Sequence, residues 1–426
     1  MYYPPDLLDF LGSCVLAYLI PTITLIATPK RSPWRYGAIL ALGVIMHHLM
    51  RPHEAASAVR IVLSCTLLTI FLTATNILLI NPLDESDLAR ERPGALILSD
   101  RLWYAFELVA FPRAINTPRQ VRNVPAHPPY LQRNGDGAQI SRNKFLVRQS
   151  VIFVWQYLVL DIFQTLAHLD GEDQDPNVGF SKIELFVPFE IWIKRLVLSL
   201  MAGFISTRIL IDAHYRFSSL VFVGLGLDVP DNWPPLFGTM ADAYTLRNYW
   251  GKFWHQFLRQ SLTGISNFVA RDVLRLPRRS PLERYTNVFV VCMVSASIHM
   301  TTDYVQCVPP EYSGAIPFFM SIVLGFMIED NVLALWKGKM NSSDDQSDSK
   351  AQTVTPIRYK VIGFIWTLVW LVVSSTWYME PISQLPQKIV TLVAFGSPSE
   401  KLGLPSILVA TATISAVVRF MLGGEV

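Results

Sequence analysis

The chain has 426 residues, of which 51% are hydrophobic and only 16% are Asp, Glu, Lys or Arg. An average soluble domain carries about 25% charged residues, so this deficit favours a membrane protein over several soluble domains. The net charge of +3 is small and dispersed, which argues against nucleic acid as a partner. The four cysteines lie far apart, without the spacing of a zinc site or a disulfide framework, so no metal is expected.

Hydropathy along the chain predicts an all-α, polytopic integral membrane protein, a single membrane domain over residues 1–426 with about eight or nine transmembrane helices. A bilayer core of about 30 Å needs about 20 mostly apolar residues per helix. The apolar segments near that length are residues 7–27, 37–49, 57–81, 149–168, 187–211, 286–304, 315–336, 359–378 and 403–421. A further apolar run, residues 218–227, is too short to span and is expected to lie at the interface or to enter the bilayer from one side.

The distribution of Lys and Arg predicts how the chain is oriented, because basic loops stay on the cytosolic side. Residues 81–148 and 229–284 hold ten and eight basic residues, whereas residues 170–184 hold five acidic residues and Lys182 alone. We therefore expect residues 229–284 to form a cytosolic amphipathic motif region and residues 170–184 to face the lumen. The membrane is expected to be that of the endoplasmic reticulum, and residues 341–350 are expected to form a flexible polar loop.

An ionisable side chain lies deep inside the predicted span 286–304. His299 is twelve residues from the cytosolic end near Asn287, or about 18 Å at 1.5 Å per residue. Ionisable residues at such a depth are costly and are functional candidates, although a neutral histidine bonded to a neighbouring carbonyl fits the same position. Asp303, one helical turn later, would share a face with His299 and could orient its imidazole, or it could be a helix-end residue that faces the lumen.

Aromatic and basic residues are concentrated in residues 233–259, which begin with Trp-Pro-Pro-Leu-Phe-Gly. If residues 245–259 form one helix, Asn248 and His255 lie on nearly the same face. The same helix would carry two tryptophans one turn apart, and three cations that could bind phosphates: Trp250, Trp254, Arg247, Lys252 and Arg259. An interfacial belt of aromatic residues is the alternative interpretation.

Three motifs, in this order, resemble the wax synthase-like branch of the membrane-bound O-acyltransferases. They are Trp233-Pro-Pro-Leu-Phe-Gly238, then Leu246-Arg-Asn-Tyr-Trp-Gly-Lys-Phe-Trp-His-Gln256, then an intramembrane Ser295-x-x-x-His299. An upstream stretch with Arg113 and Asn123-Val-Pro125 is also similar to the family, so the resemblance covers roughly residues 90–380. The chain most resembles fungal members from natural-product pathways, in which acetyl-CoA acylates a terpenoid or meroterpenoid alcohol.

The resemblance implies the transfer of an acyl group to a hydroxyl of a hydrophobic acceptor. Among acyl donors, the resemblance favours acetyl-CoA. His299 takes the place of the family's general base, and His255 takes the place of its second polar residue. Met300 follows His299, where plant members commonly carry Glu. This chemistry agrees with the residues, because an alcohol is a poor nucleophile until a base takes its proton, and His255 or Asn248 could donate to the developing oxyanion.

The co-substrate implied by the resemblance is an acyl-CoA, with no bound cofactor. The predicted contacts of the CoA phosphates are Arg247, Lys252 and Arg259. The bulky side chains of Trp250 and Trp254 could close a tunnel for a long acyl chain, but aromatic residues also line such tunnels, so long-chain wax-ester synthesis is an alternative.

Other functional classes remain open from the residues alone. A membrane prenyltransferase or terpene cyclase would need an acidic cluster, such as residues 170–175, on its catalytic side. A transporter would need internal repeats, which the sequence does not show. A non-catalytic membrane scaffold is the last alternative.

Overall fold

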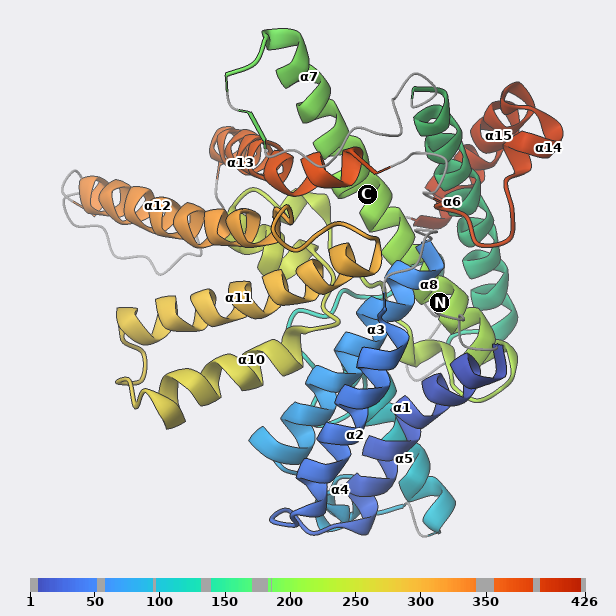
Figure 1. The fold of residues 1–426 in the computed structure, drawn as a ribbon, viewed down its shortest axis with the longest axis vertical. Coiled ribbons are helices and arrows are strands. Elements are labelled where there is room, and N and C mark those ends of the chain that lie inside the picture. The colour runs from blue at the N-terminus through green and yellow to red at the C-terminus, as the bar shows by residue number, and fades with distance from the viewer. Residues whose placement is uncertain are drawn as a thin grey trace.

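The computed structural model describes residues 7–51, 58–94, 97–131, 139–170, 183–184, 186–341, 356–385 and 391–422. The elements in these residues are helices (Figure 1). The α-helices are α1 (Leu7–Ala27), α2 (Trp34–Leu49), α3 (Ala58–Thr75), α4 (Glu85–Glu91), α5 (Leu98–Ala110), α6 (Arg142–Asp170), α7 (Phe189–Leu198), α8 (Thr207–Gly224), α9 (Leu246–Asn248), α10 (Arg259–Asn267), α11 (Pro281–Val305), α12 (Ala315–Asn341), α13 (Ile357–Ser383), α14 (Pro398–Leu402) and α15 (Leu404–Leu422).

Shorter elements of other helical types continue or connect the α-helices. The π-helical segments are η1 (Asn76–Ile80), η3 (Ser199–Ser206), η6 (Tyr249–Phe253) and η7 (Phe268–Val273). The 3-10 turns are η2 (Pro129–Leu131), η4 (Pro230–Asn232) and η5 (Met240–Asp242).

Seven stretches of described helix are long and apolar enough to cross a membrane. They are Val59–Ile80, Arg142–Leu169, Phe189–Gly224, Pro281–Val305, Ala315–Leu335, Ile357–Ser383 and Leu404–Leu422. Each overlaps one of the predicted spans, and the two earliest predicted spans form α1 and the shorter α2. Most of the predicted lumenal segment 170–184, and all but one residue of the predicted polar loop 341–350, lie outside the described residues.

One helix is longer than the sequence analysis predicts. The helix runs without a break through α7, η3 and α8, so residues 218–224 continue the preceding span and residues 225–227 follow its end. Two of the polar residues that interrupt its apolar pattern are paired inside the protein: Arg216 Nε donates to Asp212 Oδ2 at 2.7 Å. Two glutamines of α6 complete this network, each through a bond of 2.6 Å: Gln149 and Gln156. At 1.5 Å per residue, the 36 residues of this helix extend about 54 Å.

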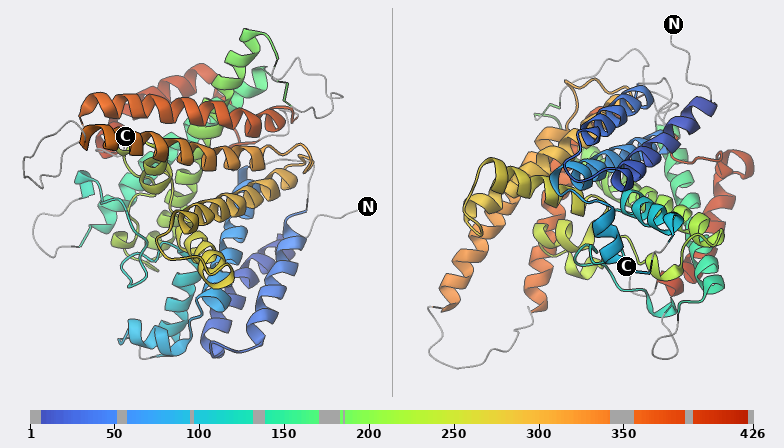
Figure 2. Two further views of the ribbon diagram at one scale, coloured as in Figure 1. Left: turned by 90° about the vertical axis from the view of Figure 1, so that its left-hand side faces the viewer. Right: turned by 90° about the horizontal axis from the view of Figure 1, so that it is seen from below.

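The long helix from α7 to α8 passes between three groups of helices (Figures 1 and 2). In the first group, α1 packs on α2 and α5, and α2 packs on α3. In the second, α11, α12 and α13 lie side by side, with α10 against α11. In the third, α6 packs against both α8 and α15. Because α3 also contacts α11 and α8, the three groups converge on one central region.

The segment between α8 and α10 is the irregular part of the fold. η6 ends at Phe253, and Trp254 then leaves the helix with a ψ of 153°. α10 begins only at Arg259, so the prediction of one helix over residues 245–259 is wrong. The physical cause is the loop that precedes α9, because the N–H of Gly238 donates to the Phe253 carbonyl at 2.8 Å and ties the end of η6 to this loop.

Gly238 tolerates no side chain at this close approach. A Cβ atom there would lie 2.3 Å from the carbonyl oxygen of Lys252, a backbone atom that cannot rotate away. At Gly251, in contrast, no atom lies within 4 Å of the position that a Cβ would occupy.

We predict that Gly238→Ala lowers the free energy of unfolding by about 1–3 kcal/mol, as overpacking of a tight contact does. Gly251→Ala is the matched control and should unfold like the wild type. Thermal unfolding of the two purified variants in the same detergent checks this prediction, and equal melting temperatures would contradict it.

Candidate active site

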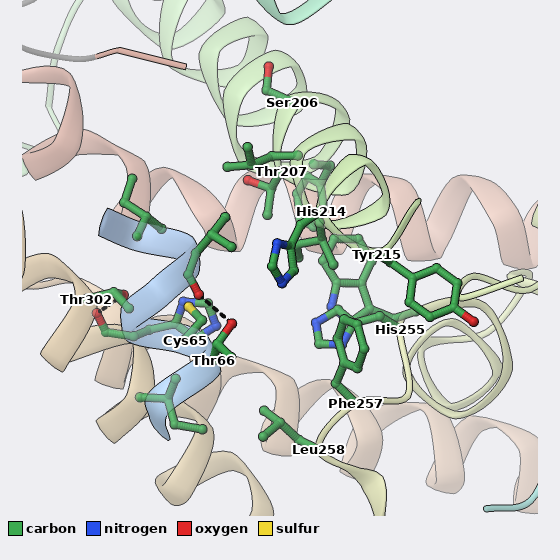
Figure 3. A pocket seen from close by; sticks show the side chains of 18 of the residues that line it. Cys65, Thr66, Ser206, Thr207, His214, Tyr215, His255, Phe257, Leu258 and Thr302 are labelled. Atoms are coloured by element: carbon green, nitrogen blue, oxygen red, sulfur yellow. Dashed lines mark hydrogen bonds between the residues drawn. The ribbon is translucent and has the colours of Figure 1, made fainter. Parts of the chain in front are cut away.

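A cavity of about 1200 Å³ lies in the central region, and most of its lining is apolar. Three histidines line it from separate elements: His214 of α8, His255 of the turn before α10 and His299 of α11. Figure 3 shows that His214 and His255 point into one space, which Cys65 and Thr66 of α3 also border. An apolar cavity with a few convergent polar groups is the usual form of a small-molecule site.

His299 is held in the cavity wall by the two helices that follow α11. Its Nδ1 lies 3.1 Å from the hydroxyl of Tyr378 in α13. Its ring centroid lies 5.0 Å from that of Phe319 in α12. Because Nδ1 is used in this hydrogen bond, Nε2 is the ring nitrogen that remains for a ligand. Tyr378 is a candidate that the sequence analysis missed, since nothing in the sequence distinguishes it from the other aromatic residues at helix ends.

Asp303 contacts the partner of His299 and not the imidazole itself. Its Oδ2 accepts a hydrogen bond of 2.6 Å from Ser313 Oγ. The carboxylate is buried and lies beside the Tyr378 hydroxyl. The backbone after Ser313 approaches α13 closely, because Gly314 has no Cβ that would overlap the main chain of α13. In this arrangement Asp303 is linked to His299 through Tyr378.

His255 lies between aromatic rings in the turn after η6. Its ring centroid is 5.6 Å from that of Trp254 and 5.8 Å from that of Phe257. Burial, and to a smaller degree the charge of the nearby His299, lowers the pKa of His255 to about 3. The imidazole is therefore neutral at neutral pH and carries one N–H that can donate a hydrogen bond.

Residues from the segment before α6 anchor the turn that carries His255. The Arg113 guanidinium, which is buried, donates to the carbonyls of both prolines in the Trp-Pro-Pro motif, at 2.7 and 2.8 Å. Gln256 Nε2 donates to the Asn123 carbonyl at 2.5 Å. Arg113 and Asn123 therefore help to fix the position of the turn that carries His255.

The other predicted binding residues are divided between the cavity and its surroundings. Trp250 and Trp254 line the cavity, whereas Asn248 does not, which favours His255 over Asn248 as the hydrogen-bond donor. The predicted phosphate-binding cations lie outside the lining. Arg247 is paired with Asp330 through bonds of 2.9 and 2.5 Å. The other two differ, because Lys252 is exposed while Arg259 donates to backbone carbonyls: those of Arg122 and Gly251.

Comparison with known proteins places these residues in a family. Residues 233–321 match the model of the Membrane bound O-acyl transferase family. The chain is 35% identical to acetyltransferase spyB of Aspergillus fumigatus, over 96% of this chain and 69% of that protein. It is 33% identical to acetyltransferase pyr8 of the same fungus, over 96% of each chain, and 34% identical to acetyltransferase TRI7 of Fusarium sporotrichioides, over 100% of this chain and 97% of that protein. No solved structure matches the chain.

The chain therefore belongs to the membrane-bound O-acyltransferase family. It is a multi-pass membrane enzyme that transfers an acyl group, and the predicted all-α membrane fold and the resemblance to fungal acetyltransferases are confirmed. The matched segment contains both His255 and His299. A prenyltransferase, cyclase, transporter or scaffold no longer fits the chain, because the family catalyses O-acyl transfer.

We predict that Arg113→Lys weakens acyl transfer about tenfold or more, because one ammonium group cannot donate to both proline carbonyls in the planar geometry of a guanidinium. The variant should also melt at a lower temperature, since hydrogen bonds to a buried charged group contribute about 1.5–3 kcal/mol each. Arg122→Lys, at an exposed position of the same segment, is the control. Unchanged turnover in Arg113→Lys would show that the turn that carries His255 does not depend on the hydrogen bonds from Arg113 to the proline carbonyls.

Proposed function

We propose that the enzyme transfers an acetyl group from acetyl-CoA to a hydroxyl of a hydrophobic terpenoid or meroterpenoid in secondary metabolism. The observation that carries this proposal is the apolar cavity of about 1200 Å³ that His255 and His299 share. Its volume exceeds the roughly 300–1,000 Å³ of ordinary small-molecule sites, so a polycyclic acceptor fits beside an acetyl group. The relatives named acetyltransferases support the choice of acyl group.

His299 is the proposed general base. When its Nδ1–H donates to the Tyr378 oxygen, the unprotonated Nε2 is free to take the proton of the acceptor hydroxyl. The acceptor oxygen then bonds to the carbonyl carbon of the thioester, and a tetrahedral intermediate forms. As this intermediate collapses, the C–S bond breaks and the proton passes from His299 to the departing sulfur. The products are the acetyl ester and free CoA, and His299 is neutral again.

His255 is proposed to stabilise the negative charge that develops on the thioester oxygen. A neutral, buried N–H is already desolvated, so its desolvation adds no free-energy cost when the charge appears. Preorganised donors of this kind commonly stabilise an oxyanion in enzymes. His255 is a donor here and not a second base, since burial already favours its neutral form.

Acyl-CoA is proposed to approach from the cytosolic side of the endoplasmic reticulum membrane, where residues 229–284 are expected to lie. The predicted phosphate contacts are Arg247, Lys252 and Arg259, of which Lys252 is the most accessible. An apolar acceptor is proposed to enter from the lipid.

We predict that His299→Ala lowers turnover by about 100-fold or more, the usual contribution of a general base. Ser297→Ala is the matched control, because Ser297 lies on the same helix with an exposed side chain whose hydroxyl bonds its own helix. Both variants should melt near the wild-type temperature. Near-normal turnover of a well-folded His299→Ala protein would refute the role of His299.

We predict that His255→Ala causes a smaller but clear loss of turnover, and that His255→Asn retains part of it, because Asn can still donate a hydrogen bond. The measurement is kcat with saturating acyl-CoA for both variants. If His255→Asn were as inactive as His299→Ala, proton transfer would be shared between the two histidines and the donor role would be wrong.

The acyl and acceptor classes are tested together with microsomes that contain the enzyme. kcat/KM is measured for acetyl-CoA and palmitoyl-CoA, each with a hydroxylated terpenoid and with a long-chain alcohol. We expect the highest value for acetyl-CoA with the terpenoid. A long-chain tunnel would favour palmitoyl-CoA by several kcal/mol, because each buried CH₂ is worth about 0.8 kcal/mol. A preference for palmitoyl-CoA and the long-chain alcohol would replace this proposal with wax-ester synthesis.

A further inference from the structure

A third imidazole lines the cavity and has no part in the proposed reaction. His214 projects from the middle of α8 into the same space as His255 (Figure 3). His214 is half-buried, and no hydrogen bond from another described residue reaches its ring. Water in the cavity can solvate this ring, but a ligand that fills the cavity displaces that water, and a polar group buried without a partner is costly. The imidazole then needs a hydrogen-bond partner on the ligand.

The hydroxyl groups around His214 are already used within their own helices. Thr66 Oγ1 donates to the carbonyl of Val62 at 2.8 Å, and Thr302 Oγ1 donates to the carbonyl of His299 at 2.8 Å. Ser218, one turn after His214, donates to the His214 carbonyl at 3.0 Å. A ligand in the cavity therefore finds few uncommitted polar side chains on these helices, and His214 is one of them.

His214 reaches the cavity from another part of the fold than the proposed base. His299 projects from α11, which packs against α12, whereas His214 projects from α8, which packs against α6. Both side chains line the same cavity. An acceptor whose hydroxyl lies at His299 would thus meet His214 with a different part of its skeleton.

We propose that His214 is a specificity-determining residue that hydrogen-bonds a second oxygen of the acceptor, a ketone or a second hydroxyl, while the first hydroxyl is acetylated at His299. The inference rests on the proposed function and deepens it, because it specifies an oxygenated polycyclic alcohol and not a plain hydrocarbon alcohol. With a ketone, His214 donates its N–H; with a hydroxyl, it can donate or accept.

The enzyme discriminates between acceptors because the ring of His214 depends on the ligand for a hydrogen bond. A plain alcohol would place hydrocarbon against the imidazole and remove it from any water in the cavity without replacing the hydrogen bond. Sites built to bond a substrate oxygen reject analogues that lack it, because their own polar group is left unpaired. The enzyme should therefore prefer the oxygenated acceptor by about tenfold or more in kcat/KM.

The test uses two polycyclic alcohols that differ at one carbon, a hydroxy-ketone and the mono-alcohol in which a methylene replaces the ketone. kcat/KM for each is measured with acetyl-CoA for the full-length wild type, for His214→Phe and for His214→Asn. We expect the wild-type preference for the hydroxy-ketone to fall to near one in His214→Phe, mainly through KM, and to be partly restored in His214→Asn. Ser218→Ala, on the next turn of α8, should keep the wild-type preference.

The outcomes separate this inference from the proposed function. If the wild type acetylates neither alcohol, the proposed acceptor class fails. If it acetylates both and His214→Phe keeps the wild-type preference, the role of His214 is refuted while the acetyl transfer stands. If His214→Phe does not fold, His214→Asn and His214→Gln replace it, and equal preferences in these variants and in Ser218→Ala overturn the inference.

Discussion

The fold depends on one constraint, that a polar group between apolar helices must find a partner. Arg35 illustrates this constraint, since its guanidinium is fully buried and donates to the carbonyls of Thr28, Leu78 and Leu83 at 2.6–3.1 Å. The Asp212–Arg216 pair does the same between α6 and α8. Breaking such a buried pair leaves an uncompensated charge, so these residues fix which helices can pack together. Against this background, the three imidazoles that line the cavity are among the polar groups that remain for a ligand.

The candidate active site depends on the end of η6, where the backbone leaves the helical conformation at Trp254. The segment from η6 to α10 would carry His255 on a regular helix if Gly238 did not tie the end of η6 to the preceding loop. Arg113 also holds that loop, through the proline carbonyls. The result is a turn that brings His255 to the cavity wall near His299, although the two residues come from different parts of the chain.

The sequence was sufficient to predict the helical membrane fold, and the two histidines that it singled out, His255 and His299, line one cavity. Hydropathy gives the length of each apolar stretch, and a stretch of about 20 residues is long enough for a helix to cross the bilayer. Seven of the predicted spans therefore coincide with long apolar helices. Helical periodicity failed for residues 245–259, because the contact of Gly238 with η6 is made by a residue outside the window in which the period is counted. Tyr378 was missed because only packing reveals that its hydroxyl lies 3.1 Å from His299.

His214 shows a second limit of sequence analysis. It lies between two apolar runs, 187–211 and 218–227, that were taken as separate because polar residues interrupt them. Two of those polar residues, Asp212 and Arg216, are paired with α6, and the helix continues through them with His214 inside it. An ionisable residue inside one continuous span would have been a functional candidate from the sequence alone.

The proposed mechanism requires that His299 deprotonates the acceptor hydroxyl inside the shared cavity. A cryo-electron microscopy structure of the enzyme with the acceptor and a non-transferable acetyl-CoA analogue tests it most directly. We expect the acceptor hydroxyl within hydrogen-bond distance of His299 Nε2, with the acetyl carbonyl directed toward His255. An acceptor hydroxyl bound elsewhere, with His299 still bonded only to Tyr378, would contradict it.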